Sequence, residues 1–169
     1  MENARFLPQL RHAGGLTTGM SDNWLILIPT SPQYVPSKDA QERAIALFKR
    51  IAPEADEIGV ELSERPRLID CGANLEKIRC PSCRGELGFD WWRDWMDQEA
   101  KLGFPLKPAA LPCCGSVRSL ADLLYDWPQG FARFSLEAMN PNIQDLPEAV
   151  EREFEAIIGC GLRQIWQHL

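Results

Sequence analysis

The spacing of apolar residues in the first third of the chain indicates two strands. Trp24–Ile28 is a continuous apolar run that ends at Pro29, which is typical of a strand buried on both faces. Apolar and polar residues then alternate over 57–63, which predicts a half-buried strand, and the stretch 67–70 either continues this strand or returns along it.

A helix is predicted between these two strands. It begins near Ser37 or Asp39, and Asp39 and Glu42 have the spacing of a capping pair. Its end is set by Pro53, which cannot continue a helix. The apolar positions recur at helical spacing and form one stripe: Ala44, Leu47, Phe48 and Ile51.

The last third of the chain repeats this order. Alternation over 132–138 predicts a strand. Asp145 and Glu148 have the spacing of a helix cap, and Gly159 is placed to end the helix that follows. The short mixed stretch 162–169 has the character of an edge strand.

Two strand–helix–strand halves therefore flank a long middle segment. This order predicts an α+β fold of the ferredoxin-like, split βαβ kind, an antiparallel sheet with its helices on one face. We expect residues 23–169 to form a single domain with an insertion at about 71–127. Residues 1–22 lack periodicity and are interpreted as an N-terminal extension, and Met20 is an alternative translation start that would leave residues 1–19 outside the native protein.

Composition and charge narrow the class of protein. The 169 residues are 45% hydrophobic and 25% charged, which is ordinary for a globular chain. No apolar run approaches the ~18 residues that span a bilayer, and no secretory signal is recognisable, so we expect a cytoplasmic protein. The formal charge of −6 and the absence of a basic cluster make nucleic acid an unlikely ligand, and favour a basic or neutral protein partner.

The middle segment contains most of the candidate chemistry. Cys80 and Cys83 form a Cys-x-x-Cys pair, and Cys113 and Cys114 are adjacent in the motif Leu-Pro-Cys-Cys-Gly. In a reducing compartment, two thiol pairs separated by such a gap are typical of a closed structural zinc site with four thiolates. Adjacent cysteines reach one ion only from a tight turn, so Cys71 is kept as an alternative to Cys114.

Two other interpretations of the thiols stay open. A redox dithiol would need one thiol at a helix N-terminus, whereas a glycine-bearing turn follows Cys83. The thiols are otherwise ordinary buried residues, which is the interpretation we favour for Cys160. His12 and His168 are distant candidate ligands.

Tryptophans are the second candidate feature. Trp91, Trp92 and Trp95 begin a predicted helix between the thiol pairs, where they either pack over the metal site or form a surface that binds a partner. Trp127 is expected to close the core beside the third strand, with a contact loop as the alternative. Trp91, Trp92 and Trp127 are therefore the candidate partner-binding residues.

Catalytic signatures are missing from the sequence. It contains no phosphate-binding glycine loop, no zinc-protease motif and no nucleophile elbow. Both histidines lie near the ends of the chain, which leaves little material for general base catalysis near neutral pH. We therefore expect a protein that is not an enzyme.

Four motifs carry a resemblance to a known group of proteins: Cys80-Pro81-Ser82-Cys83, Asp90-Trp91-Trp92, Leu111-Pro112-Cys113-Cys114-Gly115 and Tyr125-Asp126-Trp127-Pro128. Together they resemble uncharacterised short bacterial proteins with a zinc-ribbon-like element. By analogy of type, such small acidic proteins are similar to immunity proteins, which neutralise toxins by binding them. One alternative is a zinc-ribbon protein that regulates or that binds nucleic acid, for which the candidate residues are Arg67, Lys77, Arg79 and Arg84. The other is a thiol oxidoreductase that uses Cys80 and Cys83.

Overall fold

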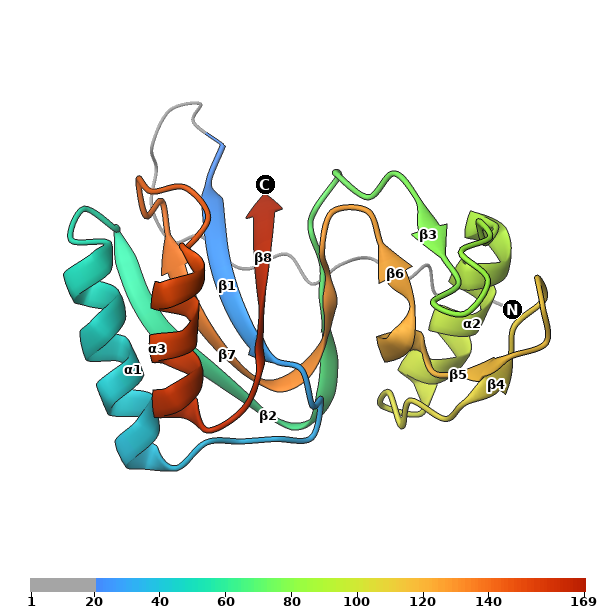
Figure 1. Cartoon of the computed structure of the whole chain (residues 1–169), viewed down its shortest axis with the longest axis horizontal. Coiled ribbons are helices and arrows are strands. Elements are labelled where there is room, and N and C mark those ends of the chain that lie inside the picture. The colour runs from blue at the N-terminus through green and yellow to red at the C-terminus, as the bar shows by residue number, and fades with distance from the viewer. Residues whose placement is uncertain (1–20) are drawn as a thin grey trace.

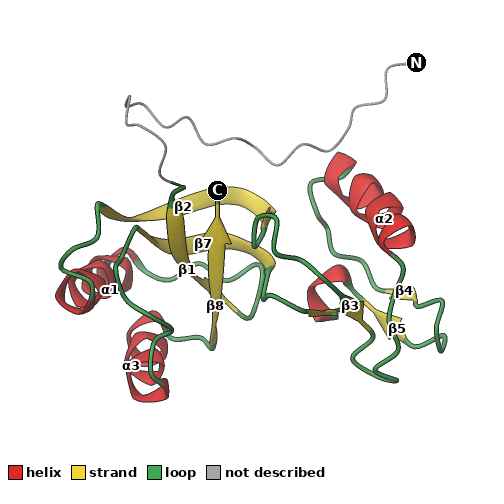
Figure 2. Cartoon of the chain, turned by 90° about the horizontal axis from the view of Figure 1, so that it is seen from above, coloured by secondary structure: helices red, strands yellow, loops and turns green. Residues whose placement is uncertain are grey.

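The computed structural model describes residues 21–169, so the predicted N-terminal extension falls, up to residue 20, outside the described residues. The main sheet is antiparallel, with strand order β2-β7-β1-β8. Its strands are β1 Asn23–Pro29, β2 Glu57–Ile69, β7 Gly130–Met139 and β8 Leu162–His168. Two helices lie on one face of this sheet (Figures 1 and 2), namely α1 Lys38–Ile51 and α3 Glu148–Ile158. The mixed α+β class predicted from the sequence is confirmed.

The segment between β2 and β7, residues 70–129, lies beside the sheet and has its own small elements (Figure 1). We call it the cysteine-rich segment. It contains a helix, two short two-stranded sheets (β3 with β6 and β4 with β5) and one 3-10 turn, η1. The elements are β3 Ile78–Arg79, α2 Phe89–Lys101, β4 Ala109–Ala110, β5 Val117–Arg118, η1 Leu120–Asp122 and β6 Leu124–Tyr125.

The predicted first strand is buried on both faces. Leu25 and Leu27 belong to the core beneath the helices, whereas Ile26 and Ile28 belong to a smaller apolar cluster on the opposite face. Alternate side chains of a strand point to opposite faces, so an uninterrupted apolar run is the pattern that such a strand requires.

The core between the sheet and the helices is closed by aromatic packing. Phe48 of α1 and Phe154 of α3 have ring centroids 5.4 Å apart at an angle of 68°. This edge-to-face arrangement is favourable beyond the area that it buries. The remaining buried members come from β1, β7 and both helices and include Leu25, Leu27, Ala44, Leu47, Phe134, Leu136, Ala138 and Ile158.

The helix ends match the sequence prediction only in part. Ser37 caps α1, because its hydroxyl accepts a hydrogen bond from the backbone N–H of Ala40. The predicted capping pair of Asp39 and Glu42 is wrong, since Asp39 lies within the first turn of the helix. Its negative charge there still interacts favourably with the helix dipole. Helix α3 terminates as predicted, with Gly159 in the left-handed region at φ 83°.

The cap predicted for α3 is also wrong. Pro147 precedes the helix without a side-chain cap, and Glu148 is already its first residue. Asp145 instead accepts a hydrogen bond from the indole nitrogen of Trp166, at 2.6 Å. Asp145 therefore bonds to a side chain that is distant in the sequence instead of to the backbone at the start of α3.

The outer strand β2 is interrupted in the middle. Its pairing with β7 shifts register between Leu62 and Arg67, and Pro66 lies inside this irregular stretch. The hydroxyl of Ser63 donates to the carbonyl of Arg65 at 2.6 Å, which stabilises the bend. A bulge with a proline is a common way to protect an exposed sheet edge from pairing with another chain.

The cysteine-rich segment has a hydrophobic core of its own that extends to the sheet. Ile78, Leu87, Met96 and Leu120 are buried within it. Phe131, the second residue of β7, belongs to the same cluster, and its ring centroid lies 5.3 Å from that of Phe104. The segment is therefore packed against the main sheet, between two strands of which it lies in the sequence.

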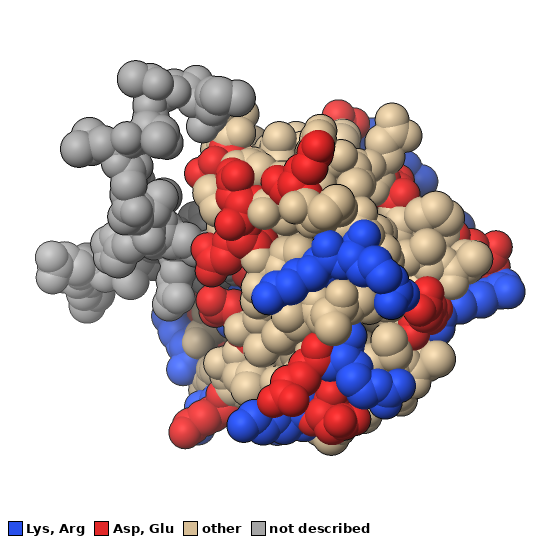
Figure 3. Space-filling model, turned by 90° about the vertical axis from the view of Figure 1, so that its left-hand side faces the viewer, with Lys and Arg blue, Asp and Glu red and all other residues tan. Residues whose placement is uncertain are grey.

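Charges on the molecular surface are mixed in sign. Figure 3 shows basic and acidic side chains interleaved over the face of the molecule that lies on the left in Figure 1. The helices carry two ion pairs, Arg43 with Asp39 within α1, and Arg50 of α1 with Glu153 of α3. Within residues 21–169, no helix combines the length and the apolar character needed to cross a membrane.

One glycine fixes where the chain leaves the sheet. Gly72 has φ +70° and forms a bridge to His168 at the end of β8. A Cβ atom at this position would lie 2.5 Å from the carbonyl oxygen of His168. Such contacts are shorter than real Cβ atoms make, so the close approach of the two backbones requires glycine.

We therefore predict that Gly72→Ala lowers the free energy of unfolding by about 2–4 kcal/mol, because it adds both backbone strain and a backbone clash. Gly59→Ala is the matched control, since a Cβ atom added at Gly59 would meet nothing within 4 Å. The control should be neutral or up to about 1 kcal/mol more stable, as alanine replaces glycine within a strand. Urea unfolding measures both, and equal stability of the two variants would contradict the prediction.

Candidate metal centre

The first pair of thiols lies on a tight loop, residues 80–85. The backbone N–H of Cys80 donates to the carbonyl of Gly85 at 2.9 Å, and the N–H of Arg84 donates to the carbonyl of Cys80 at 3.0 Å. Arg84 adopts φ 63°, in the left-handed region. This turn directs several backbone N–H groups toward the cysteine sulfurs, as the glycine-bearing sequence after Cys83 predicts.

The second pair lies on a loop with the same backbone hydrogen bonds. The N–H of Leu111 donates to the carbonyl of Ser116 at 2.9 Å, and the N–H of Gly115 donates to the carbonyl of Leu111 at 2.9 Å. Gly115 has φ 73° and occupies the place that Arg84 has in the first loop. The two loops are therefore the same turn formed twice.

This equivalence explains why the second pair is adjacent in sequence. Leu111 stands where the first loop has Cys80, and Cys114 stands where it has Cys83. The remaining thiol, Cys113, occupies the third position of the turn instead of the first. Both loops have proline at their second position, and this shared residue is the signal in the sequence from which their equivalence could have been predicted.

The four sulfurs lie together in space. Sγ atoms are 3.7 Å apart for Cys80 and Cys114, 3.5 Å for Cys83 and Cys113, and 3.8 Å for Cys113 and Cys114. All four lie within 4.8 Å of one another. With Zn–S bonds of about 2.3 Å, the sulfurs of a tetrahedral site are separated by about 3.8 Å. The four cysteines therefore have the spacing needed to hold one metal ion.

Backbone and hydroxyl groups surround these sulfurs. The N–H groups of Ser82 and Cys83 lie 3.3 and 3.5 Å from Sγ of Cys80, and the N–H of Gly85 lies 3.4 Å from Sγ of Cys83. The hydroxyl of Ser116 is 3.6 Å from Sγ of Cys80 and 3.3 Å from Sγ of Cys114. Such donors stabilise thiolates and orient metal ligands.

The same contacts set the acidity of the thiols. Burial by itself raises the pKa of Cys80, but hydrogen bonds from the N–H of Cys83, the hydroxyl of Ser116 and the N–H of Ser82 lower this pKa to about 5. Contacts with Ser116 likewise lower the pKa of Cys114. Burial and then the neighbouring thiols raise the pKa of Cys113 to about 12. Without a metal, thiolates so close together cannot all be ionised, and a cation removes this conflict.

The other two cysteines lie away from this cluster. Cys71 is fully buried, and its thiol donates to the side-chain oxygen of Gln129 at 3.6 Å. Burial, followed by the charge of Asp70, raises the pKa of the Cys71 thiol to about 11. The group of possible ligands contains Cys114 and does not contain Cys71. Cys160 packs at the edge of the main core, and all six cysteines are free thiols.

The histidines considered as ligands do not join the cluster as far as the structure describes them. His168 lies at the end of β8, between Trp127 and Trp166. His12 falls outside the described residues. Among residues 21–169, the candidate metal centre therefore consists of sulfur ligands only.

The tryptophans of α2 pack within the cysteine-rich segment. Trp91, Trp92 and Trp95 are half-buried against its core, and the indole nitrogen of Trp92 donates to the hydroxyl of Tyr125 at 3.2 Å. Met96 and Glu99 are the fully buried residues of this helix. The carboxylate of Glu99 accepts the backbone N–H of Leu106 at 2.7 Å and so fixes the loop after the helix.

The surroundings of Trp127 differ from those predicted. The expectation that it closes the core is wrong, because 43% of its surface is exposed. It also adopts φ 65°, which is unusual for a residue other than glycine. Of the three candidate partner-binding residues, Trp127 is the exposed one.

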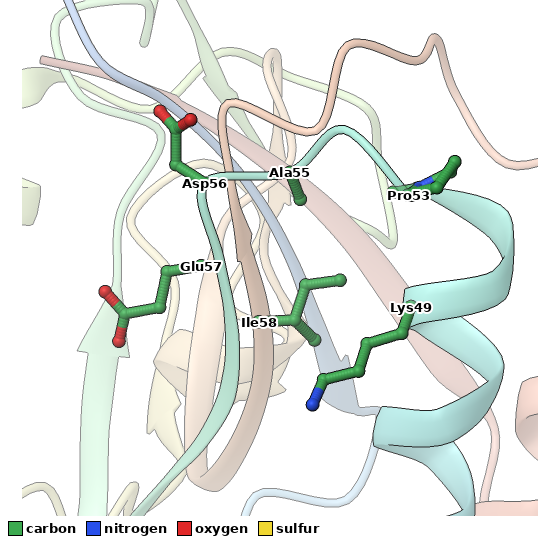
Figure 4. Close-up of a pocket in the computed structure, with 7 residues that line it drawn as sticks. Lys49, Pro53, Ala55, Asp56, Glu57 and Ile58 are labelled. Carbon is green, nitrogen blue, oxygen red and sulfur yellow. The ribbon is translucent and has the colours of Figure 1, made fainter.

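A shallow pocket of about 460 Å³ lies elsewhere, between the end of α1 and the start of β2. Figure 4 shows Lys49 on the helix side of this pocket, and Asp56 and Glu57 on the strand side. Asp56 accepts a hydrogen bond from Asn140 at 2.8 Å. The lining contains no thiol and no histidine, so the cysteine cluster remains the stronger candidate for a functional site.

Comparison with known proteins gave no match: no family model, no curated protein and no solved structure matches this chain.

We predict that the purified protein contains about one zinc ion per chain and that Cys83→Ser and Cys114→Ser both lose it. Both variants should also unfold at lower denaturant concentration, because the metal links two loops that are far apart in the sequence. Elemental analysis and urea unfolding measure these effects.

Cys160→Ser is the matched control, since this thiol lies outside the cluster, and it should retain the metal. A metal-free protein with unchanged stability, or full metal retention by Cys114→Ser, would contradict the prediction.

Proposed function

We propose that Cys80, Cys83, Cys113 and Cys114 bind one structural zinc ion, and that the protein acts by binding another protein. The observation that carries this proposal is the mutual spacing of the four sulfurs. Four thiolates complete the tetrahedral shell of zinc and leave no position for a water molecule or a substrate. A site of this kind stabilises structure and is poorly suited to metal-assisted catalysis.

The arrangement of elements supports a specific scaffold. The strand order β2-β7-β1-β8 with two helices on one face fits a ferredoxin-like, split βαβ fold. The two equivalent turns at residues 80–85 and 111–116, each near a short two-stranded pairing, fit a zinc-ribbon-like insertion between the second and third strands of that fold.

A protein partner is favoured by charge and by exposed aromatic surface. The formal charge of −6 suits a neutral or basic partner, and exposed tryptophan, such as Trp127, is common among residues that dominate binding. Within this class we propose a cytoplasmic inhibitor of the immunity-protein type, which neutralises a bacterial toxin by binding it. This last step rests on an analogy of type, in size and acidity, and not on a motif.

The surroundings of the candidate nucleic-acid residues give that alternative less support. Arg67 pairs with Glu137 at 3.4 Å and lies 4.0 Å from Glu61, and Arg79 pairs with Asp126 at 2.6 Å. Cations already paired with carboxylates have little charge left to neutralise phosphates. Zinc binding would also make the cluster more negative.

The oxidoreductase alternative has a similar weakness. Helix α2 begins at Phe89, six residues after Cys83, so neither thiol of the first pair is part of the first turn of that helix, where a redox thiol is made acidic. Cys80 and Cys83 also have two further thiols in contact, which suits coordination better than a two-electron exchange within one pair.

We predict that the tagged holoprotein, purified from its native host without chelator, retains one protein partner in equal molar amount. Expressed alone in a second host, this partner should slow growth, and co-expression of the present chain should restore growth. Recovery is quantified by mass spectrometry and rescue by growth rate.

The zinc-site variant and its control sharpen this experiment. Cys83→Ser should fail to restore growth because the cysteine-rich segment loses its metal, whereas Cys160→Ser should restore it. A partner that is harmless alone, or whose toxicity the wild-type chain leaves unchanged, would refute the inhibitor function.

A further inference from the structure

The four sulfurs of the candidate metal centre form two close pairs between the two turns. Sγ atoms are 3.7 Å apart in the Cys80/Cys114 pair and 3.5 Å apart in the Cys83/Cys113 pair. Each pair takes one sulfur from residues 80–85 and one from residues 111–116. The two pairs differ in the hydrogen-bond donors that surround them.

The Cys80/Cys114 pair is rich in donors. Cys80 is fully buried, and the N–H groups of Ser82 and Cys83 donate to its sulfur at 3.3 and 3.5 Å. Cys114 is exposed, but the hydroxyl of Ser116 lies 3.3 Å from its sulfur and 3.6 Å from that of Cys80. A thiolate has no proton to give, so this hydroxyl is the donor whenever the sulfurs are ionised.

The Cys83/Cys113 pair has fewer donors and lies open to solvent. Both residues are exposed, and the N–H of Gly85 donates to Sγ of Cys83 at 3.4 Å. Cys113 contacts only the other thiols of the cluster. Within residues 21–169, it is therefore the sulfur of the four that no N–H and no hydroxyl stabilises.

This asymmetry comes from the last residue of each turn, which is Gly85 in the first and Ser116 in the second. A Cβ atom added at Gly85 would lie 3.2 Å from Sγ of Cys83 and 3.7 Å from Cβ of Cys113. A side chain at position 85 would thus crowd this pair, and glycine leaves it uncovered from that side. The second turn instead places a hydroxyl beside the Cys80/Cys114 pair.

Zinc coordination holds all four cysteines as thiolates, so access and hydrogen bonding decide their relative reactivity. Donors that stabilise a thiolate lower its nucleophilicity, and the oxidation of cysteine follows thiolate character and exposure. Cys113 combines exposure with the absence of a donor among the described residues. It is therefore the most nucleophilic sulfur of the zinc-bound cluster.

We propose that Cys113 is the site at which a hydroperoxide oxidises the zinc centre, and that Cys83 then forms a disulfide with it. This inference rests on the proposed zinc site and adds a reversible chemical modification of that site. The modification is stoichiometric and does not make the chain an enzyme.

With hydrogen peroxide the reaction has two steps. The thiolate of Cys113 attacks one peroxide oxygen, the O–O bond breaks, hydroxide leaves and Cys113 becomes a sulfenic acid. The thiolate of Cys83 then attacks this sulfur, an S–S bond forms and a second hydroxide leaves. The two sulfurs lose two electrons in total and the peroxide gains them. Two of the four zinc ligands are consumed, so the ion is released.

Cys83 is a better partner for Cys113 than Cys114 is, although both sulfurs are near. Consecutive Cα atoms are about 3.8 Å apart, whereas disulfides join Cα atoms that are about 4.4–6.8 Å apart. A disulfide between adjacent cysteines therefore distorts the backbone. Cys83 lies on the other turn, so its disulfide keeps the two turns linked and zinc can rebind after reduction.

The test treats the zinc-loaded full chain with one equivalent of hydrogen peroxide, without chelator or reductant. A chromogenic indicator follows zinc release, and mass spectrometry of the acid-quenched, digested chain locates disulfides. We expect about one zinc ion released per peroxide consumed, a disulfide between Cys83 and Cys113, and recovery of zinc binding after reduction. Limiting iodoacetamide, added instead of peroxide, should alkylate Cys113 about fivefold faster than any other ligand.

A variant that changes no ligand tests the role of the donors. Ser116→Ala removes the hydroxyl beside Cys80 and Cys114, and it should raise the alkylation rate of Cys114 by about threefold while that of Cys113 stays unchanged. Ser82→Ala is the matched control, because the N–H of Ser82 and not its hydroxyl contacts Cys80, and this variant should react like the wild type.

Three results overturn the proposal: a first disulfide between Cys80 and Cys114, alkylation of Cys113 no faster than that of Cys114, or zinc retained after excess peroxide. Zinc content is measured before either reagent is added. If the purified chain binds no zinc, the proposed zinc site falls together with this inference. If zinc is bound and Cys113 is not the preferred sulfur, this inference falls and the zinc site stands.

Discussion

The cysteine-rich segment is organised around four sulfur atoms that lie close enough together to hold one metal ion. Apart from α2, the segment has only pairs of two-residue strands and one 3-10 turn over about 60 residues. So little regular structure supplies few hydrogen bonds and a small core, and domains of this size commonly require a metal or disulfides. The cluster brings residues 80–85 and residues 111–116 together. Neither of these loops is hydrogen-bonded into the main sheet.

Much of the fold follows from the pattern of residues because the pattern reflects burial. The apolar run of β1, the apolar stripe of α1 and the alternation in β7 each predicted an element that the structure contains. The caps predicted at Asp39 and Asp145 are wrong, because the choice of hydrogen-bond partner is made in the folded chain. Ser37 accepts the N–H at the start of α1, and Asp145 accepts the indole N–H of Trp166. The paired strands of the cysteine-rich segment are only two residues long, too short to produce any periodicity.

The candidate site could be predicted by ligand identity and not by geometry. Thiol count and spacing indicated Cys80, Cys83, Cys113 and Cys114, and the structure brings these four sulfurs together. Sequence spacing alone left Cys71 as a rival for Cys114, because it did not reveal that Cys113 occupies the third position of a turn. Trp127 was misplaced for a related reason: tryptophan is usually buried, and its left-handed backbone is set by the surrounding loop.

The chain enters and leaves the cysteine-rich segment at a single point of the sheet, since Ile69 and Gly130 are paired across β2 and β7. In terms of topology, the whole segment is therefore a single connection between the neighbouring strands β2 and β7. The entropy of closing such a connection grows only with the logarithm of its length. Evolution is thus free to lengthen, shorten or replace this segment while the four strands and two helices keep their arrangement, provided that the contact of Phe131 with Phe104 finds a substitute.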